Sequence, residues 1–378
     1  MIYFDNAATT RVDENVVKAM DECFLENYGN ASSSHSFGEK AKQALENSRK
    51  IIAESINADS EEIYFTSGGT ESNNWVLKEI FFANPEKKKI ITTKIEHDSI
   101  LENAEFLKKM GANIIYLNVD EKGFIDFKQL EKELDEKTLL VSIIHGNNEI
   151  GTIQNLEKIG AICKSKKVYF HSDACQSYTK IKIDVKKQNL DLVTLNAHKI
   201  HGPKGVGALY LRKSVKIFPM LHGGGHERGM RSGTENVTGI VGFAKAVENA
   251  LMKNVENMTK LRDYAIQKIL EIPNTKLNGS SGTSRLCNNI NISFRNVEGE
   301  ALLSSLEFYG IIVSTGSACA SHKLKKSHVL KAINLNDLEI NSSIRVTISK
   351  YTTKEEINYF IEKLKIVVKK LREISPFK

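Results

Sequence analysis

Cysteine pairs, long apolar runs and a leader-like opening are all missing from this sequence of 378 residues. It has five cysteines, an odd number, and no two of them form a CxxC pair, so we expect neither a disulfide framework nor a zinc site, and a reducing compartment is favoured. No apolar run approaches the ~18 residues of a membrane-spanning helix, and the opening MIYFDNAATT lacks the basic and apolar regions of a signal peptide. We therefore expect a cytoplasmic protein without membrane attachment.

Strong charge of one sign is also lacking. The formal net charge is +7, from 53 basic and 46 acidic residues, and the lysines are scattered along the chain rather than clustered. A solvated surface explains this balance, so direct nucleic-acid binding is not expected, although a basic surface for an acidic partner stays open. The hydrophobic share of 41% and the length are typical of a globular protein of two domains, large enough to bury a core without disulfides or a structural metal.

Short apolar runs alternate with amphipathic stretches over the first two thirds of the chain. Seven runs are typical of strands, at 63–66, 90–93, 114–117, 139–145, 168–171, 192–195 and 206–211. The stretches between them, such as 71–82 and 99–110, are typical of helices. The pattern therefore predicts βαβ units and an α/β fold, in which a mostly parallel seven-stranded sheet carries helices on both faces.

The last third of the chain predicts a second, smaller α/β domain. A helical pattern runs from about 236 to 272, and a linker-like stretch follows at 278–284. Beyond it lie two strand-like and two helical segments, at 289–294, 299–309, 343–349 and 354–372. We predict a large domain over residues 15–260, and a small domain formed by residues 1–14 and 261–378.

Five polar clusters directly follow five of the predicted strands. They are TSGGTE at 66–71, EHDS at 96–99, NNEIG at 147–151, HSDACQ at 171–176 and NAHKIHGPKG at 196–205. Because the carboxyl ends of parallel strands meet at one edge of a sheet, we expect these clusters to converge there. Taken singly, each cluster also fits an ordinary structural role. Thr70 could cap a helix, Asp173 could cap a loop, and Lys199 could be a structural lysine.

Three further segments carry candidate chemistry. Cys319 lies in the small-residue loop STGSACAS with lysines and histidines close behind, and positive charge favours the reactive thiolate, although an inert exposed cysteine is the alternative. The glycine-rich loop 222–234 carries two arginines and could cover a site or reach a neighbouring subunit. Arg345 begins a predicted strand, where it could clamp a carboxylate or form an ordinary ion pair.

Together the clusters supply an anion cup, an acid, a lysine, a histidine and a carboxamide. This set meets the needs of pyridoxal phosphate, which requires a cup for its phosphate and an acid to hold the pyridinium proton. It also requires a lysine that reacts with its aldehyde and a flat group over its ring.

Seven motifs that follow YFDNAATT carry a resemblance over essentially the whole chain. They are TSGGTESNN, EHDS, NNEIGTIQ, HSDACQ, AHKIHGPKG, GGGHERGMRSGT and STGSACAS. With them the sequence resembles the pyridoxal-phosphate-dependent cysteine desulfurases of the class V aminotransferase family, which supply iron–sulfur cluster assembly. The resemblance implies the type I fold of pyridoxal-phosphate transferases and a homodimer.

By position, the resemblance implies which residues bind the cofactor. Lys199 would form the Schiff base, Asp173 would pair with the pyridine nitrogen, and Thr234 would reach the phosphate of the other subunit. The phosphate would be held by Gly69, Thr70 and His198, with Asn196 nearby. His97 would stack on the ring, and Asn148 and Gln176 would lie near the ring hydroxyl and the substrate.

The resemblance also implies the reaction. Arg345, with Asn148, would bind the substrate, and Lys199, His97 and Cys319 would be catalytic. Lys199 would remove the α-proton of L-cysteine, and Cys319 would take the substrate sulfur as a persulfide, so that L-alanine leaves. The sulfur would pass to an iron–sulfur scaffold or another acceptor protein. No intrinsic metal site is expected, and Cys319 is a candidate transient cluster ligand.

Departures from the family pattern and other activities stay open. Arg11 and Ala31 stand where the family usually has proline, and Cys175 stands where a small or apolar residue other than cysteine is usual. A selenocysteine lyase uses the same cofactor chemistry and is the main alternative. An aminotransferase would have no need of the STGSACAS loop, and a binding scaffold for a sulfur acceptor is the alternative outside enzymes.

Overall fold

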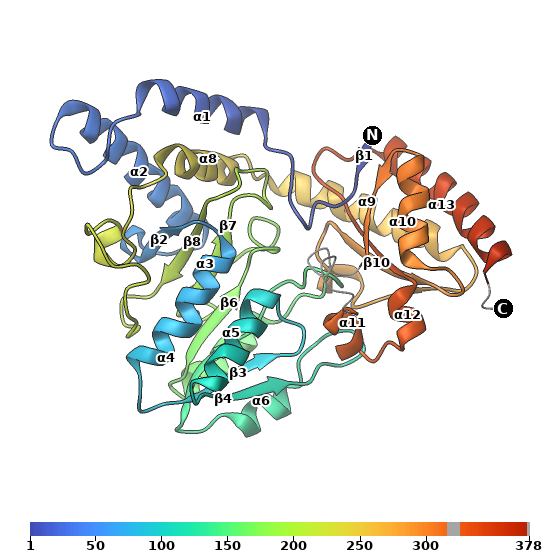
Figure 1. Cartoon of the computed structure of the whole chain (residues 1–378), viewed down its shortest axis with the longest axis horizontal. Helices are drawn as coiled ribbons and strands as arrows, with labels where there is room; N and C mark the ends of the chain where they lie inside the picture. Colours follow the sequence, from blue (N-terminus) through green and yellow to red (C-terminus); the bar gives the residue numbers. More distant parts are fainter. Residues whose placement is uncertain (316–325, 376–378) are drawn as a thin grey trace.

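A central sheet organises the larger part of the computed structural model, which describes residues 1–315 and 326–375 (Figure 1). In spatial order its seven strands are β2 (Ile63–Thr66), β8 (Gly207–Leu211), β7 (Leu192–Asn196), β6 (Tyr169–Asp173), β5 (Thr138–Ser142), β3 (Lys89–Thr93) and β4 (Asn113–Leu117). Each strand overlaps one of the seven predicted runs.

Strand β8 runs against the direction of the other strands. The neighbours β7–β6, β6–β5, β5–β3 and β3–β4 pair in parallel, whereas β8 pairs antiparallel with both β2 and β7. The short connection 197–206 explains this, because parallel neighbours need a longer crossover that usually contains a helix. The expected mostly parallel sheet is confirmed, and the carboxyl ends of β2, β3, β5, β6 and β7 lie at one edge.

Helices cover both faces of this sheet. They are α1 (Glu14–Glu26), α2 (Ser36–Ser55), α3 (Gly69–Asn74), α4 (Ile80–Ala83), α5 (Asp98–Lys109), α6 (Phe127–Glu133), α7 (Leu156–Ser165) and α8 (Val237–Glu248). Successive residues of a strand point to opposite faces. On β7, Val193 joins a core with Leu45 of α2 and Phe243 of α8, while Leu192 joins a separate core with Ile100 of α5. Burial on both faces explains why the strands are almost uniformly apolar.

A smaller antiparallel sheet forms the second body of the molecule. Its four strands, in spatial order, are β12 (Ser314–Thr315), β13 (Ser343–Thr347), β10 (Asn289–Phe294) and β9 (Thr275–Leu277). The helices of this part of the chain are α9 (Met252–Leu270), α10 (Gly299–Phe308), α11 (His328–Ala332), α12 (Asp337–Asn341) and α13 (Lys354–Ile374). Side chains of α9, α10 and α13 pack in one core with those of β10 and β13.

The chain crosses between the two bodies more than once. Strand β1 (Ile2–Tyr3) pairs with β11 (Ile311–Ile312), so the N-terminal segment lies on the side of the smaller sheet (Figure 1). In the other direction, Val329 and Leu330 of α11 belong to the core of the central sheet. We propose that the domains divide at residues 14 and 260, with α11 as the contact that ties the small domain to the large one.

Two local expectations from the sequence are corrected. The helical pattern of residues 236–272 is broken into α8 and α9 by residues 249–251. The linker-like stretch 278–284 is exposed only at residues 281–283, and Asn278 is 1% exposed and donates to Asn291 Oδ1 and Ser293 Oγ, both at 2.8 Å. Small polar residues are buried here because they satisfy one another. Among the helices of the described residues, none is long and apolar enough to cross a bilayer.

Candidate active site

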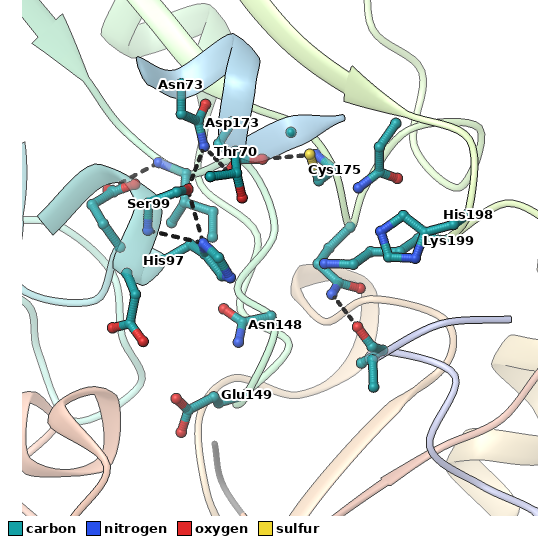
Figure 2. Close-up of a pocket in the computed structure, with 18 of the residues that line it drawn as sticks. Thr70, Asn73, His97, Ser99, Asn148, Glu149, Asp173, Cys175, His198 and Lys199 are labelled. Carbon is teal, nitrogen blue, oxygen red and sulfur yellow. Dashed lines mark hydrogen bonds between the residues drawn. The ribbon is translucent and has the colours of Figure 1, made fainter. Parts of the chain in front are cut away.

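A cavity of about 330 Å³ lies at the edge of the central sheet where the parallel strands end (Figure 2). Of the predicted site residues that the structure describes, all but Thr234 line it, namely Gly69, Thr70, His97, Asn148, Asp173, Gln176, Asn196, His198, Lys199 and Arg345. The five polar clusters therefore do converge at one place. Their individual roles stay predictions at this point.

The cup predicted for an anion lies between β2 and α3. Helix α3 begins at Gly69 after a cap at Gly68. Thr70 is therefore not the N-cap of this helix, as the structural alternative had it. Backbone N–H groups at a helix start attract an anion. The packing is so close that glycine is required at two positions. A Cβ on Gly69 would lie 2.6 Å from Cys175 Sγ, and one on Gly207, at the start of β8, would lie 2.7 Å from Gly68 Cα.

Asp173 is the last residue of β6 and is buried at one end of the cavity. Its Oδ1 accepts from the Cys175 N–H at 2.9 Å, and its Oδ2 accepts from Asn73 Nδ2 at 2.8 Å. Burial alone would raise the pKa of this carboxyl, but the nearby His97 and these hydrogen bonds hold the pKa below its usual value. Asp173 is therefore an ionised acid, ready to pair with a cationic group in the cavity.

Sequence reasoning missed Asn73, although a signal was present. Asn73 lies four residues after Gly69, and helical spacing places both residues on one face of α3. Its Nδ2 donates to Ser99 Oγ at 2.8 Å as well as to Asp173, and Figure 2 shows both bonds. Asn73 thus connects the acid on β6 to the start of α5.

His97 caps α5 and lies next in the same network. Its Nδ1 accepts from the Ser99 N–H at 3.1 Å, and the ring is 2.9 Å from Ser99 Oγ. Burial and the neighbouring Lys199 lower the pKa of His97, so the ring is neutral at pH 7. Because Nδ1 accepts the backbone N–H, the single ring proton belongs on Nε2.

Lys199 follows β7, and a hydrogen bond from Lys180 fixes its main chain. Lys180 Nζ donates to the Lys199 carbonyl at 3.2 Å and to the Gln176 carbonyl at 2.9 Å. Gln176 in turn donates from Nε2 to the Ala7 carbonyl at 2.9 Å, which brings the N-terminal segment to the cavity. The main chain around Lys199 is therefore fixed, while its side chain reaches the cavity (Figure 2).

His198 lies beside Lys199, on the side of the N-terminal segment. Its Nδ1 is 3.2 Å from Thr9 Oγ1. Burial, together with the neighbouring lysines, lowers the pKa of His198 to about 4, so this ring is also neutral at pH 7. A neutral imidazole can donate one hydrogen bond to an anion without adding a charge.

Arg345 lies on β13 and reaches the cavity from the smaller sheet. Its Nη1 donates to the Asn148 carbonyl at 3.1 Å, and its Nη2 donates to Asp5 Oδ1 at 2.9 Å. Its buried Nε has no hydrogen-bond partner among the described residues. Asp5 lies in the opening segment YFDNAATT, 340 positions away, and no role had been predicted for it.

Two buried acids also line the cavity and were not predicted. Glu96 Oε1 accepts from Thr93 Oγ1 at 2.7 Å and from the Ile144 N–H at 3.0 Å, and burial raises the pKa of Glu96 to about 8. Glu149 Oε2 accepts from Ser327 Oγ at 2.5 Å, and burial raises its pKa as well. Within residues 1–315 and 326–375, no group of three or more metal-ligating side chains is present.

One predicted site residue of the described part of the chain lies elsewhere. Thr234 is exposed and lines a second cavity of about 160 Å³ together with Arg231. Arg231 forms an ion pair with Glu71 of α3 at 2.8 Å, so the loop that carries Thr234 is tied to the anion cup. Cys319 lies outside the described residues.

Comparison with known proteins decides the family. The profile of the aminotransferase class-V family matches residues 2–360. The chain belongs to the class-V aminotransferase family. A cysteine desulfurase IscS of Dictyoglomus turgidum is 48% identical over 382 residues, covering 100% of this chain and 97% of the relative. A solved NifS-like protein is 40% identical with a TM-score of 0.91, covering 97% of this chain and 99% of that one. A structure of SspA in complex with cysteine is 35% identical with a TM-score of 0.84, covering 93% and 100%.

Class-V aminotransferases depend on pyridoxal phosphate, and this cavity fits that cofactor. It offers an anion cup, an ionised acid and a lysine around one space. The buried Oδ1 atoms of Asn73, Asn148 and Asn196 have no hydrogen-bond partner among the described residues, as expected where a polar ligand belongs. The expected cofactor and the expected fold of the pyridoxal-phosphate transferases are confirmed.

Proposed function

We propose that this chain is a pyridoxal-phosphate-dependent cysteine desulfurase, which takes sulfur from L-cysteine, releases L-alanine and keeps the sulfur as a persulfide on Cys319. One observation carries the proposal. Ten of the twelve predicted site residues line one cavity in a chain that is 48% identical to a cysteine desulfurase over its full length. The relatives described above favour L-cysteine over selenocysteine as the substrate.

Cofactor binding falls to residues of the central sheet. Gly69, Thr70 and His198 would hold the phosphate, Lys199 would bind the aldehyde, and Asp173 would pair with the protonated ring nitrogen. Once bound, the cofactor would supply the electron sink that makes the α-proton of an amino acid acidic. His97 would contact the ring, and its neutral state avoids a second positive charge beside Lys199.

Substrate binding falls to Arg345 and Asn148, at the other end of the cavity. A guanidinium recognises a carboxylate through paired N–H donors, and Arg345 has an unused Nε there. This contact orients the α-proton of the substrate toward Lys199, whose amine accepts the proton at Nζ. Positioning of this kind accounts for a large part of enzymatic rate enhancement.

Sulfur transfer falls to Cys319. Its thiolate attacks the substrate sulfur, an S–S bond forms, and the Cβ–S bond breaks with its electron pair left on carbon. Protonation of that carbon completes L-alanine. One L-cysteine and one thiol therefore become one L-alanine and one persulfide, with no outside oxidant.

The sulfur acceptor, the dimer and the compartment complete the proposal. We propose that the persulfide serves an iron–sulfur scaffold or another sulfur-acceptor protein, which fits the IscS name of the relatives. A homodimer would bring Thr234 of one subunit to the phosphate cup of the other. The cytoplasm remains the proposed compartment, since the cysteine usage favours reducing conditions.

Mass spectrometry after incubation with L-cysteine tests the proposal. We expect L-alanine in the medium and one extra sulfur atom on the peptide that carries Cys319. The buried Cys23, Cys163 and Cys287 are internal controls, because burial raises the pKa of each thiol and suppresses the thiolate. A Cys319→Ser variant should retain the cofactor and lose desulfuration. Normal turnover in that variant, or sulfur on another cysteine, would overturn the assignment.

A further inference from the structure

Arg345 has a carboxylate partner before any substrate arrives. Its Nη2 is 2.9 Å from Asp5 Oδ1, and the exposed fractions of the two side chains are 3% and 17%. This is a largely buried ion pair, in contrast to a surface pair that contributes little. The residue proposed to hold the substrate carboxylate is therefore already neutralised by a neighbouring acid.

Asp5 cannot easily move away from Arg345. It forms a parallel bridge with Thr347, two residues beyond Arg345 on β13. On either side, the Thr347 N–H donates to the Phe4 carbonyl at 2.7 Å and Asn6 Nδ2 donates to the Thr347 carbonyl at 2.7 Å. The Phe4 ring lies in the core of the small domain. The main chain therefore fixes the Asp5 carboxylate beside the guanidinium.

The guanidinium still has capacity for a second carboxylate. It carries five N–H groups, and the structure uses one for Asp5 and one for the Asn148 carbonyl. A substrate carboxylate can therefore bind without displacing Asp5. The substrate carboxylate then lies close to the negative charge of Asp5, and the single positive charge of Arg345 interacts with both carboxylates.

From this geometry we propose that Asp5 sets the affinity for the amino acid carboxylate by opposing it across Arg345. The inference rests on the proposed function, because it requires that Arg345 holds the carboxylate. Asp5 weakens substrate and product binding alike. Tight binding of an unreacted amino acid does not raise the rate of the chemical step, whereas weaker binding speeds departure of L-alanine. Asp5 thus lowers the affinity for amino acid carboxylates and favours product release.

Substitution of Asp5 by asparagine separates its charge from its shape. Asp5→Asn retains an oxygen that accepts from Arg345 Nη2 but carries no charge. Calorimetric titration of the holoenzyme with L-alanine should show a dissociation constant lowered roughly threefold or more. L-alaninol, which replaces the carboxylate with an alcohol, should bind with unchanged affinity. The gain for L-alanine should shrink as salt is raised.

Matched variants make the outcome decisive. Glu256→Gln makes the same change in net charge at an exposed position on α9 and should leave both affinities unchanged. Arg345→Ala should strongly weaken the binding of L-alanine, both in the wild-type chain and in the Asp5→Asn variant. The inference is overturned if Asp5→Asn leaves the L-alanine affinity unchanged or weaker, or tightens both ligands equally. Desulfuration by the wild-type preparation is measured in parallel, so failure of the proposed function appears separately as absence of L-alanine formation from L-cysteine.

Discussion

The two ends of the cavity are built in different ways. At the Asp173 end, every element belongs to the large domain, and both carboxylate oxygens already have protein donors. At the Arg345 end, the small sheet, the N-terminal segment and the loop after β5 meet, and the guanidinium retains unused donors. The Asp173 end, called the saturated end because both oxygens of its acid accept protein hydrogen bonds, belongs to one domain and suits a group that stays bound. An unsaturated end assembled from several segments suits a ligand that comes and goes.

The largest effect is expected from the saturated end. Asp173→Asn preserves shape but removes the charge that we propose pairs with the ring nitrogen of the cofactor. We expect kcat for L-alanine formation to fall by about a hundredfold or more. Absorbance of the bound cofactor, measured in the same preparation, controls for loss of binding. A variant with full cofactor content and normal kcat would show that the two ends do not differ as proposed.

A smaller effect, of a different kind, is expected at the other end. Arg345→Lys keeps the positive charge and loses the planar fork of donors. We expect KM for L-cysteine to rise about tenfold, with a smaller change in kcat and an unchanged cofactor content. Arg372→Lys on α13 provides the remote control. Loss of cofactor from the Arg345 variant would contradict the proposal that the Asp173 end binds the cofactor and the Arg345 end binds the substrate.

The smallest effect concerns stability near the saturated end. Burial raises the pKa of Glu96 to about 8, above its usual value of 4.5. The unfolded chain therefore releases this proton first, so the contribution of Glu96 to stability is complete below pH 4.5 and is lost as pH rises through about 8. Glu96→Gln, a neutral mimic of the protonated acid, should flatten this decline. Melting temperatures of both proteins across that range, at equal cofactor saturation, test it. Parallel curves would contradict the prediction.

Much of the saturated end could be read from the sequence. Each cluster there directly follows an apolar run, and the topology of parallel sheets brings such clusters together without knowledge of any side chain. Asn73 could also have been predicted from the sequence, since it lies one helical turn after Gly69. The break at 249–251 was not, because no glycine or proline marks it.

The Arg345 end could be predicted only in part. Arg345 itself was found at the start of a strand, but its partner Asp5 is 340 positions away, and pairing between such distant segments leaves no periodic signal. The raised pKa of Glu96 has the same origin, since it depends on how completely the fold excludes water around one carboxyl. Contacts of this kind follow from packing, and local patterns do not encode them.

The reversed direction of β8 determines which residue lies under the turn between β2 and α3. Because β8 begins at this edge of the sheet instead of ending there, Gly207 lies beside that turn, and a Cβ on Gly207 would lie 2.7 Å from Gly68 Cα. A single hydrogen atom in place of a methyl group leaves room for the turn against the sheet. The approach of α3 to the sheet therefore depends on the smallest side chain available, on a strand that contributes no residue to the lining of the cavity.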